Sequence, residues 1–316
     1  MCTYGKSEAK HVIAFTFGAL LMLGLVLSVA RQVRASSPTY TTIDYPGAVN
    51  GNSFATDIND RGQIVGEYQY GPNFNTQRYG YLRSDGTFSP IIYPGSLWTR
   101  AVAINRNGDI VGDWAKGVNS GNGQDFGFLL RGGEYTLLQF PNSDSTIPAG
   151  INANGDIVGW YLDKVGMHGF LLSGGVYTSI DFPGSAAFTQ AWKINDNGEI
   201  AGRYDGATDG KYHMFVYSNG IFTAVPDVPG AFETAVVEGG GFNNVGDIVS
   251  QYCNVKSCSL FTPGTVHGFL LSGGVYTTFD PPGSIGTGAF GLDSFDDIVG
   301  AYVDSSGRVH GYLRTP

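Results

Sequence analysis

The stretch from Met167 to Tyr204, MHGFLLSGGVYTSIDFPGSAAFTQAWKINDNGEIAGRY, decides the fold because recognisable versions of it recur through most of the chain after residue 38. It contains two predicted hairpins, in which apolar and β-branched runs flank Ser173-Gly174-Gly175 and then Asp196-Asn197-Gly198. Glycine supplies the positive φ that such tight turns need. Phe182-Pro183-Gly184 separates the hairpins and predicts a loop, since proline cannot donate to a strand ladder. Each unit therefore predicts four short strands.

The unit recurs at a spacing of roughly 45 residues, which is typical of a four-stranded propeller blade. Versions of the second hairpin occupy segments 58–66, 104–112, 151–159, 194–202, 242–250 and 292–300. The last version of the first hairpin, His310–Arg314, stops before its second strand, and Tyr40–Gly47 supplies a strand of that kind at the other end of the chain. Ring closure would pair these two segments and leave no open sheet edge. We therefore predict an all-β fold, a six-bladed β-propeller closed by pairing of the N-terminal and C-terminal strands.

The strand before each turn asparagine is expected to be the innermost strand of its blade. Small residues stand four positions before these asparagines, or before Asp293 in the last unit, and small side chains suit the crowded strand nearest an axis. They are Ala55, Ala101, Pro148, Ala191, Gly239 and Ala289.

Two motifs carry a resemblance to a known family. The openings His168-Gly169-Phe170 and His267-Gly268-Phe269 are followed downstream by versions of Ile-Asn-x-x-Gly-Asp-Ile-Val-Gly. These motifs resemble the bacterial extracellular repeats called the HAF family, over roughly residues 39 to 316. Glycine replaces the alanine of the family name, and His213-Met214-Phe215 departs further. The resemblance implies an exported repeat protein and brings no catalytic residues with it.

The first 35 residues read as a secretory signal. Lys6 and Lys10 precede a charge-free run from Val12 to Ala30, and Val33-Arg34-Ala35 precedes Ser36. We therefore predict a signal peptide over residues 1–35, cleavage after Ala35, and a single propeller domain over residues 36–316. An uncleaved anchor is the alternative, because the apolar run approaches the length that spans a bilayer. The expected location is secreted or extracellular, with the periplasm and the cell surface as alternatives.

Charge and cysteine content agree with export. The formal net charge of −9 makes nucleic acid an unsuitable partner. Cys253 and Cys258 flank four residues inside the longest insertion, and in an oxidising compartment this spacing predicts a local disulfide. After cleavage of the signal we expect no membrane association, and we expect a monomer.

The candidate binding residues lie on the face that carries the long connections between hairpins, because variable loops on a rigid scaffold are where recognition usually sits. Polar residues five positions before the turn asparagines are expected near the axial mouth of this face, beside aromatic residues of neighbouring loops. The expected cup comprises Arg100, Gln190, Glu238, Trp98, Tyr70 and Phe74. The competing interpretation is a set of solvated rim residues with no shared ligand.

No catalytic, cofactor or metal site is predicted. His168, His213, His267 and His310 share one repeat position, but Tyr79 and Phe126 fill that position in two other units. This pattern favours a packing role over zinc, which needs three or four convergent ligands.

The favoured function is a secreted, non-catalytic binding or structural repeat protein that contacts an extracellular carbohydrate or protein through its long-loop face. The alternative is a secreted glycan hydrolase or lyase that uses acids such as Glu238, Asp57 or Glu233. A purely architectural surface protein is a third hypothesis.

Overall fold

The computed structural model describes residues 37–72, 77–117, 125–236 and 239–316. The chain divides into two units, Met1–Ala35 and Ser36–Pro316, and only the second falls within the described residues. The predicted signal peptide and its cleavage site therefore lie outside the described part. None of the described residues forms a helix of the length and apolar character needed to cross a membrane.

The described chain is all-β apart from one short 3-10 helix, η1 (Val49–Gly51). From β2 to β17, strands pair antiparallel in consecutive groups of four, as the two-hairpin unit predicts. The first two groups comprise β2 (Ser53–Ile58), β3 (Ile64–Gln69), β4 (Arg78–Ser84) and β5 (Thr87–Ile91), and then β6 (Trp98–Ile104), β7 (Ile110–Ala115), β8 (Phe126–Arg131) and β9 (Glu134–Leu138).

The next two groups belong to one larger sheet, joined where Met167 pairs parallel with Phe188. Their strands are β10 (Ser145–Ile151), β11 (Ile157–Leu162), β12 (Met167–Ser173), β13 (Val176–Ile180), β14 (Ser185–Ile194), β15 (Ile200–Gly206), β16 (Tyr212–Ser218) and β17 (Ile221–Val225). The following group is β18 (Glu233–Thr234), β19 (Gly241–Phe242), β20 (Ile248–Cys253), β21 (Val266–Ser272) and β22 (Val275–Phe279).

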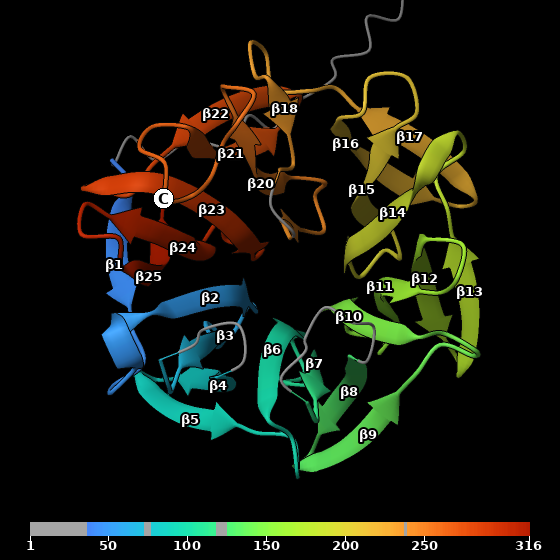
Figure 1. Ribbon diagram of the computed structural model, residues 1–316, viewed down its shortest axis with the longest axis horizontal. Helices are drawn as coiled ribbons and strands as arrows, with labels where there is room; N and C mark the ends of the chain where they lie inside the picture. Colours follow the sequence, from blue (N-terminus) through green and yellow to red (C-terminus); the bar gives the residue numbers. More distant parts are fainter. Residues whose placement is uncertain (1–36, 73–76, 118–124, 237–238) are drawn as a thin grey trace, which may run out of the picture. The chain divides into compact units, whose positions relative to one another are not determined.

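The terminal strands lie in one sheet, which confirms the expected pairing of the chain ends. β1 (Thr39–Ile43) pairs antiparallel with β25 (Val309–Thr315), which continues through β24 (Ile298–Asp304) to β23 (Ser284–Leu292). Figure 1 shows β2, β6, β10, β14 and β23 nearest a common centre, with β5, β9, β13 and β17 on the outside. In these five repeats the strand before the turn asparagine, or before Asp293, is thus the inner strand, as expected.

A β-bulge interrupts the inner strands and explains the glycine of the Ile-Val-Gly motif. The register shifts between Ala55 and Asp57, and it shifts again at the equivalent place in β6, β10, β14 and β23. The bulge pushes an inner-strand carbonyl against the second strand. A Cβ on Gly112 would lie 2.0 Å from the carbonyl oxygen of Arg100, and Gly66, Gly159, Gly202 and Gly300 are equally crowded. Only glycine fits such an approach of two backbones.

The fifth repeat replaces this glycine with Ser250, and its inner strand is broken. β18 and β19 each contribute two residues, and Ala235 and Gly239 between them have positive φ angles of 62° and 104°. The Ser250 hydroxyl donates to the carbonyl of Gly239 at 3.3 Å. A side chain is tolerated at position 250 because no inner-strand carbonyl approaches the second strand there as closely as in the other repeats.

The structure gives a different reason from the expected one for the small size of these inner-strand residues. A Cβ on Gly80, in the third strand of the first repeat, would lie 2.9 Å from the backbone nitrogen of Ala101 in the next repeat, and Gly311 approaches Ala55 in the same way. Ala55, Ala101, Ala191 and Ala289 are fully buried. Small side chains are needed for packing against the preceding repeat, rather than for crowding at the axis.

Candidate functional site

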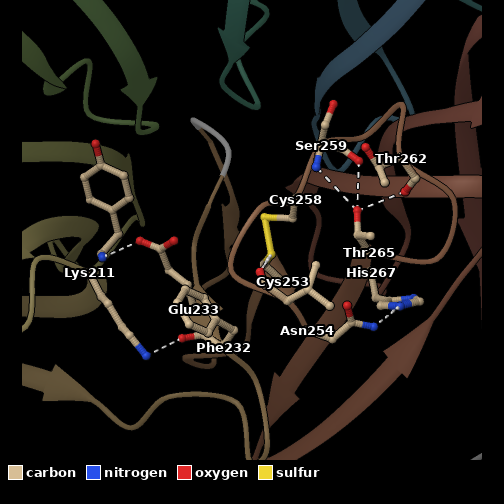
Figure 2. Close-up of a disulfide and its surroundings, with 12 residues drawn as sticks. Lys211, Phe232, Glu233, Cys253, Asn254, Cys258, Ser259, Thr262, Thr265 and His267 are labelled. Carbon is tan, nitrogen blue, oxygen red and sulfur yellow. Dashed lines mark hydrogen bonds between the residues drawn. A yellow bond between two sulfur atoms is a disulfide. The ribbon is translucent and has the colours of Figure 1, made fainter.

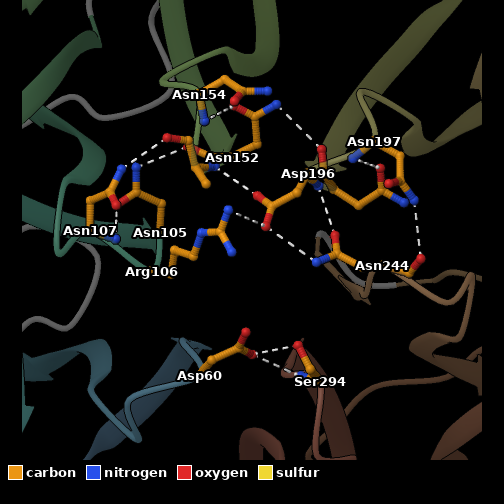
Figure 3. A network of polar contacts seen from close by, with 12 residues as sticks. Asp60, Asn105, Arg106, Asn107, Asn152, Asn154, Asp196, Asn197, Asn244 and Ser294 are labelled. Atoms are coloured by element: carbon orange, nitrogen blue, oxygen red, sulfur yellow. Dashed lines mark hydrogen bonds and ion pairs between the residues drawn. The ribbon is translucent and has the colours of Figure 1, made fainter.

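A circuit of asparagine side chains runs around one end of the inner strands. The Oδ1 atom of each turn asparagine accepts backbone N–H groups two and four residues ahead, as Asn105 does from Asn107 and Asp109. Its Nδ2 atom donates to the equivalent carbonyl of the next repeat. Each bond leads from one repeat to the next. The successive pairs are Asn59 to Asn105 (2.9 Å), Asn105 to Asn152 (2.9 Å), Asn152 to Asn195 (3.3 Å), Asn195 to Asn243 (3.2 Å) and Asn243 to Asp293 (3.4 Å). Figure 3 shows part of this network. One residue type thus both caps the turn and links neighbouring repeats.

The last repeat departs from this pattern because it has Asp293 in place of asparagine. Its Oδ1 still accepts from Phe295 and Asp297, but an ionised carboxylate has no hydrogen to donate. The circuit closes one residue later, where the backbone and the hydroxyl of Ser294 both donate to Asp60, at 3.0 and 2.7 Å. Burial raises the pKa of Asp293 to about 7, and the nearby carboxylates of Asp297 and Asp60 add to the rise.

Asp293→Asn is expected to stabilise the protein in a pH-dependent way. The folded pKa lies above the unfolded value of about 3.9, so the native state holds an extra proton, and the free energy of unfolding falls as pH rises from about 4 to 7. The variant removes this fall and restores the amide donor. We expect a gain of about 1–3 kcal/mol at pH 8, after allowance for solvent screening, and almost none at pH 4.

Urea unfolding across this pH range measures the effect. Asn243→Asp is the matched reverse variant and should acquire the same pH dependence. Parallel pH profiles for the wild type and Asp293→Asn would contradict the account.

A larger cavity lies toward the other end of the inner strands. The space inside the asparagine circuit is only about 80 Å³, whereas this cavity measures about 340 Å³. Ligand pockets usually span about 300–1,000 Å³, so only the second has the size of a ligand site. Its walls come from several repeats, which places it on their common axis. The residues that line the cavity are Phe54, Thr56, Glu67, Arg78, Arg100, Val102, Ala149, Trp160, Trp192, Lys193, Gly239 and Phe290.

Ion pairs hold the cationic side chains of this cavity. Arg100 bonds Asp113 in a bidentate pair, with Nε–Oδ1 at 2.8 Å and Nη2–Oδ2 at 2.9 Å. Arg78 lies 3.4 Å from Glu67. The guanidinium groups of Arg78 and Arg100 also lie 5.0 and 6.0 Å from the ring centre of Trp98. Planar guanidinium groups fixed in this way are preorganised donors.

A further ion pair joins Lys193 of β14 to Asp57 of β2, with Nζ–Oδ1 at 2.9 Å. Asp57 Oδ2 also accepts the backbone N–H of Ile104 at 3.0 Å. Burial raises the pKa of Asp57, although Lys193 and the backbone N–H groups act in the opposite direction. These contacts connect three inner strands beside the cavity.

The predicted site residues are partly brought together. Arg100 lines the cavity, and Trp98 is fully buried beneath it. Tyr70 stacks on Tyr79 and donates to the carbonyl of Leu97, so it lies next to Trp98 without lining the cavity. Gln190 is buried behind the wall, where its Oε1 accepts from Arg203 and Trp192. Glu238 and Phe74 lie outside the described residues.

Sequence reasoning missed the residue that follows the glycine of the Ile-Val-Gly motif. This residue is buried in every repeat and differs in every repeat, whereas the residues beside it in the sequence hardly change. In order of repeat, it is Glu67, Asp113, Trp160, Arg203, Gln251 and Ala301. Phe54 pairs with Glu67 and Arg100 with Asp113 across the first two strands, so these residues lie level with the cavity. A position-by-position comparison of the six repeats would have revealed them, because variation at a single buried position is unusual in a regular scaffold.

The repeated histidines have carboxylate partners. Nδ1 of His168, His267 and His310 lies 2.9, 2.8 and 2.8 Å from Asp181, Asp280 and Asp44 respectively. Each of these rings also lies against a tyrosine, as Tyr302 does against His310. Within the described ranges, no group of three or more His, Cys, Asp or Glu side chains is placed to hold a metal ion.

A disulfide joins Cys253, the last residue of β20, to Cys258 in the segment between β20 and β21 (Figure 2). Glu233 lies close by and accepts the backbone N–H of Tyr212 at 2.8 Å. Of the three acids considered for catalysis, Glu233 and Asp57 thus have structural partners, and Glu238 is outside the described residues.

Comparison with known proteins gives the fold class alone. No protein-family model and no curated protein matches the chain. The chain is similar to β-propeller proteins. A protein assigned as TolB in Agrobacterium tumefaciens aligns with a TM-score of 0.56 and 13% identity, over 84% of this chain and 91% of that one. The gluconolactonase XC5397 from Xanthomonas campestris aligns with a TM-score of 0.52 and 12% identity, over 88% and 90%.

TolB from Acinetobacter baumannii has a TM-score of 0.48 and 12% identity, over 84% of this chain. This chain spans only 55% of that protein's length. At such low identities the likenesses concern the arrangement of strands and transfer no activity.

Proposed function

We propose that this chain is a secreted, non-catalytic binding module, built as a closed six-bladed β-propeller, that takes a carbohydrate into its axial cavity. The observation that carries the proposal is the wall of that cavity. Trp160, Trp192, Phe54 and Phe290 supply aromatic surface, while Arg78 and Arg100 supply fixed hydrogen-bond donors. Sugars have apolar ring faces and polar edges, and this combination of side chains suits both.

The size and form of the site favour a small ligand over a protein partner. A cavity of about 340 Å³ matches a mono- or disaccharide, whereas protein interfaces are broad surfaces of about 800 Å² on each partner. The six sequence repeats, the pairing of β1 with β25 and the polar circuit from Asn59 to Ser294 support ring closure. The apolar leader, the disulfide and the HAF-like motifs support export.

Val102→Trp tests this site directly. Val102 lies at the bulge of β6, is partly buried and lines the cavity, so an indole there fills the space that a ligand would occupy. We expect thermal unfolding of the full chain to shift upward with at least one member of a panel of cello-, chito-, xylo- and galacturono-oligosaccharides. The variant should bind that saccharide about tenfold or more weakly, a loss of about 1.4 kcal/mol.

Val245→Trp is the control, because Val245 is 71% exposed in a turn of the fifth repeat. This variant should bind as the wild type does. Unchanged affinity in Val102→Trp would place the ligand elsewhere, and a panel with no shift at all would reject the carbohydrate.

A glycan hydrolase or lyase remains the alternative function. Turnover of the bound saccharide by the purified protein would establish it in place of the binding module.

A further inference from the structure

In two of the ion pairs beside the cavity, the cationic side chain faces the cavity and the carboxylate lies behind it. Arg100 and Lys193 line the cavity, whereas their partners Asp113 and Asp57 do not. The side chain of Arg100 is 22% exposed, and that of Asp113 is fully buried behind it. Glu67 is the one carboxylate among the described lining residues, against the three cations Arg78, Arg100 and Lys193. Each of the three cations is paired with a carboxylate, but only Glu67 of the three partner carboxylates lines the cavity, so the wall presents more cationic than anionic groups to a ligand.

Two of these cations form one part of the wall. Arg78 begins β4, Arg100 lies in the neighbouring β6, and both guanidinium groups lie over the same indole, Trp98. Arginine held in a fixed plane suits a bidentate contact with a carboxylate or sulfate group. The tryptophans that line the cavity, Trp160 and Trp192, come from the third and fourth repeats. The two arginines and the two tryptophans of the wall thus belong to different repeats.

The burial of the pairs favours binding of an anion without a large rearrangement. Asp113 accepts two bonds from one guanidinium, so Arg100 is already oriented before any ligand arrives. A preorganised cation loses little side-chain entropy on binding. Its charge is also less screened than that of a surface arginine, since water is partly excluded from the cavity.

We infer that the saccharide taken by this cavity is acidic, with its anionic group against Arg78 and Arg100 and its ring against Trp192 or Trp160. This inference rests on the proposed function and specifies its ligand class. A carboxylate of a uronic acid and a sulfate ester share the required chemistry, since each presents oxygen atoms to a guanidinium fork.

Matched sugars test the inference on the full chain by calorimetric titration. The probes are glucose with glucuronate, galactose with galacturonate, the corresponding neutral and uronate disaccharides, and galactose 6-sulfate. The acidic member of at least one pair should bind at least tenfold more tightly than its neutral counterpart. Its affinity should fall between 50 and 500 mM salt, because added ions screen the attraction.

The double variant Arg100→Gln/Asp113→Asn isolates the charge, because it keeps an amide donor and acceptor while it removes the cation and the buried anion together. We expect it to lose most of the preference for the acidic sugar and to bind the neutral sugar as the wild type does. The matched control is Arg131→Gln/Asp109→Asn, another Arg–Asp pair at 2.9 Å, of which neither residue lines the cavity.

The outcomes separate the two proposals. Equal binding of acidic and neutral sugars would overturn the inference and leave the carbohydrate site in place. An equal loss of both sugars in the double variant would also overturn it, since Arg100 would then shape the cavity without reading charge. Preference for galactose 6-sulfate over both uronates would support the inference and identify sulfate as the group. Absence of binding by every probe would reject the site and the inference together.

Discussion

Replacing Arg100 with leucine is expected to lower the free energy of unfolding by about 3–5 kcal/mol, because it leaves a buried carboxylate without its partner. Asp113 is fully buried, and Arg100 gives it two short hydrogen bonds. Removal of one member of such a pair costs more than removal of both. Adding Asp113→Asn to Arg100→Leu should therefore recover most of the lost stability.

Chemical denaturation measures both effects, and Arg131→Leu is the matched control. The Arg131–Asp109 pair is also 2.9 Å long, but the Arg131 side chain is 56% exposed. Exposed pairs contribute about 0–1 kcal/mol, so this variant should lose little. A loss below about 1 kcal/mol in Arg100→Leu would mean that water reaches Asp113 and that the cavity wall is not preorganised.

Gly112→Ala is expected to cost about 3 kcal/mol or more, because there is no room for a methyl group at this position. The added Cβ would lie 2.0 Å from the carbonyl oxygen of Arg100 and 2.9 Å from the ring of Phe128. Either the bulge of β6 or the second strand would have to move. Such a movement would also shift Arg100, so weaker saccharide binding should accompany the loss of stability.

Ser250→Ala is the control for this prediction. It keeps a Cβ at the equivalent position of the fifth repeat, where the inner strand leaves the ladder, and it removes only the hydrogen bond to Gly239. It should cost about 1 kcal/mol. A melting temperature of Gly112→Ala equal to that of the wild type would contradict the role given to the bulge.

The strand order could be predicted from sequence because its signals are local. Turns such as Ser173-Gly174-Gly175 mark where each hairpin reverses, and Tyr40–Gly47 is a version of the second strand that the hairpin version at His310–Arg314 lacks. The pairing of β1 with β25 follows from these two facts. The break in the fifth repeat was marked only by Ser250 in place of glycine, and its meaning depends on the bulge, which periodicity does not indicate.

The cavity could be predicted only in part. The spacing from Arg100 to Asn105 predicts that Arg100 lies near the axis, and Arg100 lines the cavity. The same spacing from the turn asparagine also predicts that Gln190 lies in the cup. Gln190 instead lies behind the cavity wall, where it accepts hydrogen bonds from Arg203 and Trp192. The contact between Lys193 and Asp57 joins repeats far apart in the chain. It depends on the three-dimensional arrangement of the repeats, which no local pattern records.

A crystal structure of the protein soaked with the tightest-binding acidic sugar tests directly whether the axial cavity is a saccharide site. We expect electron density for the sugar inside the cavity, with its anionic group within hydrogen-bonding distance of Arg78 or Arg100 and its ring against Trp192 or Trp160. Density for the sugar on another surface, with only water in the cavity at a saturating concentration, would contradict this expectation.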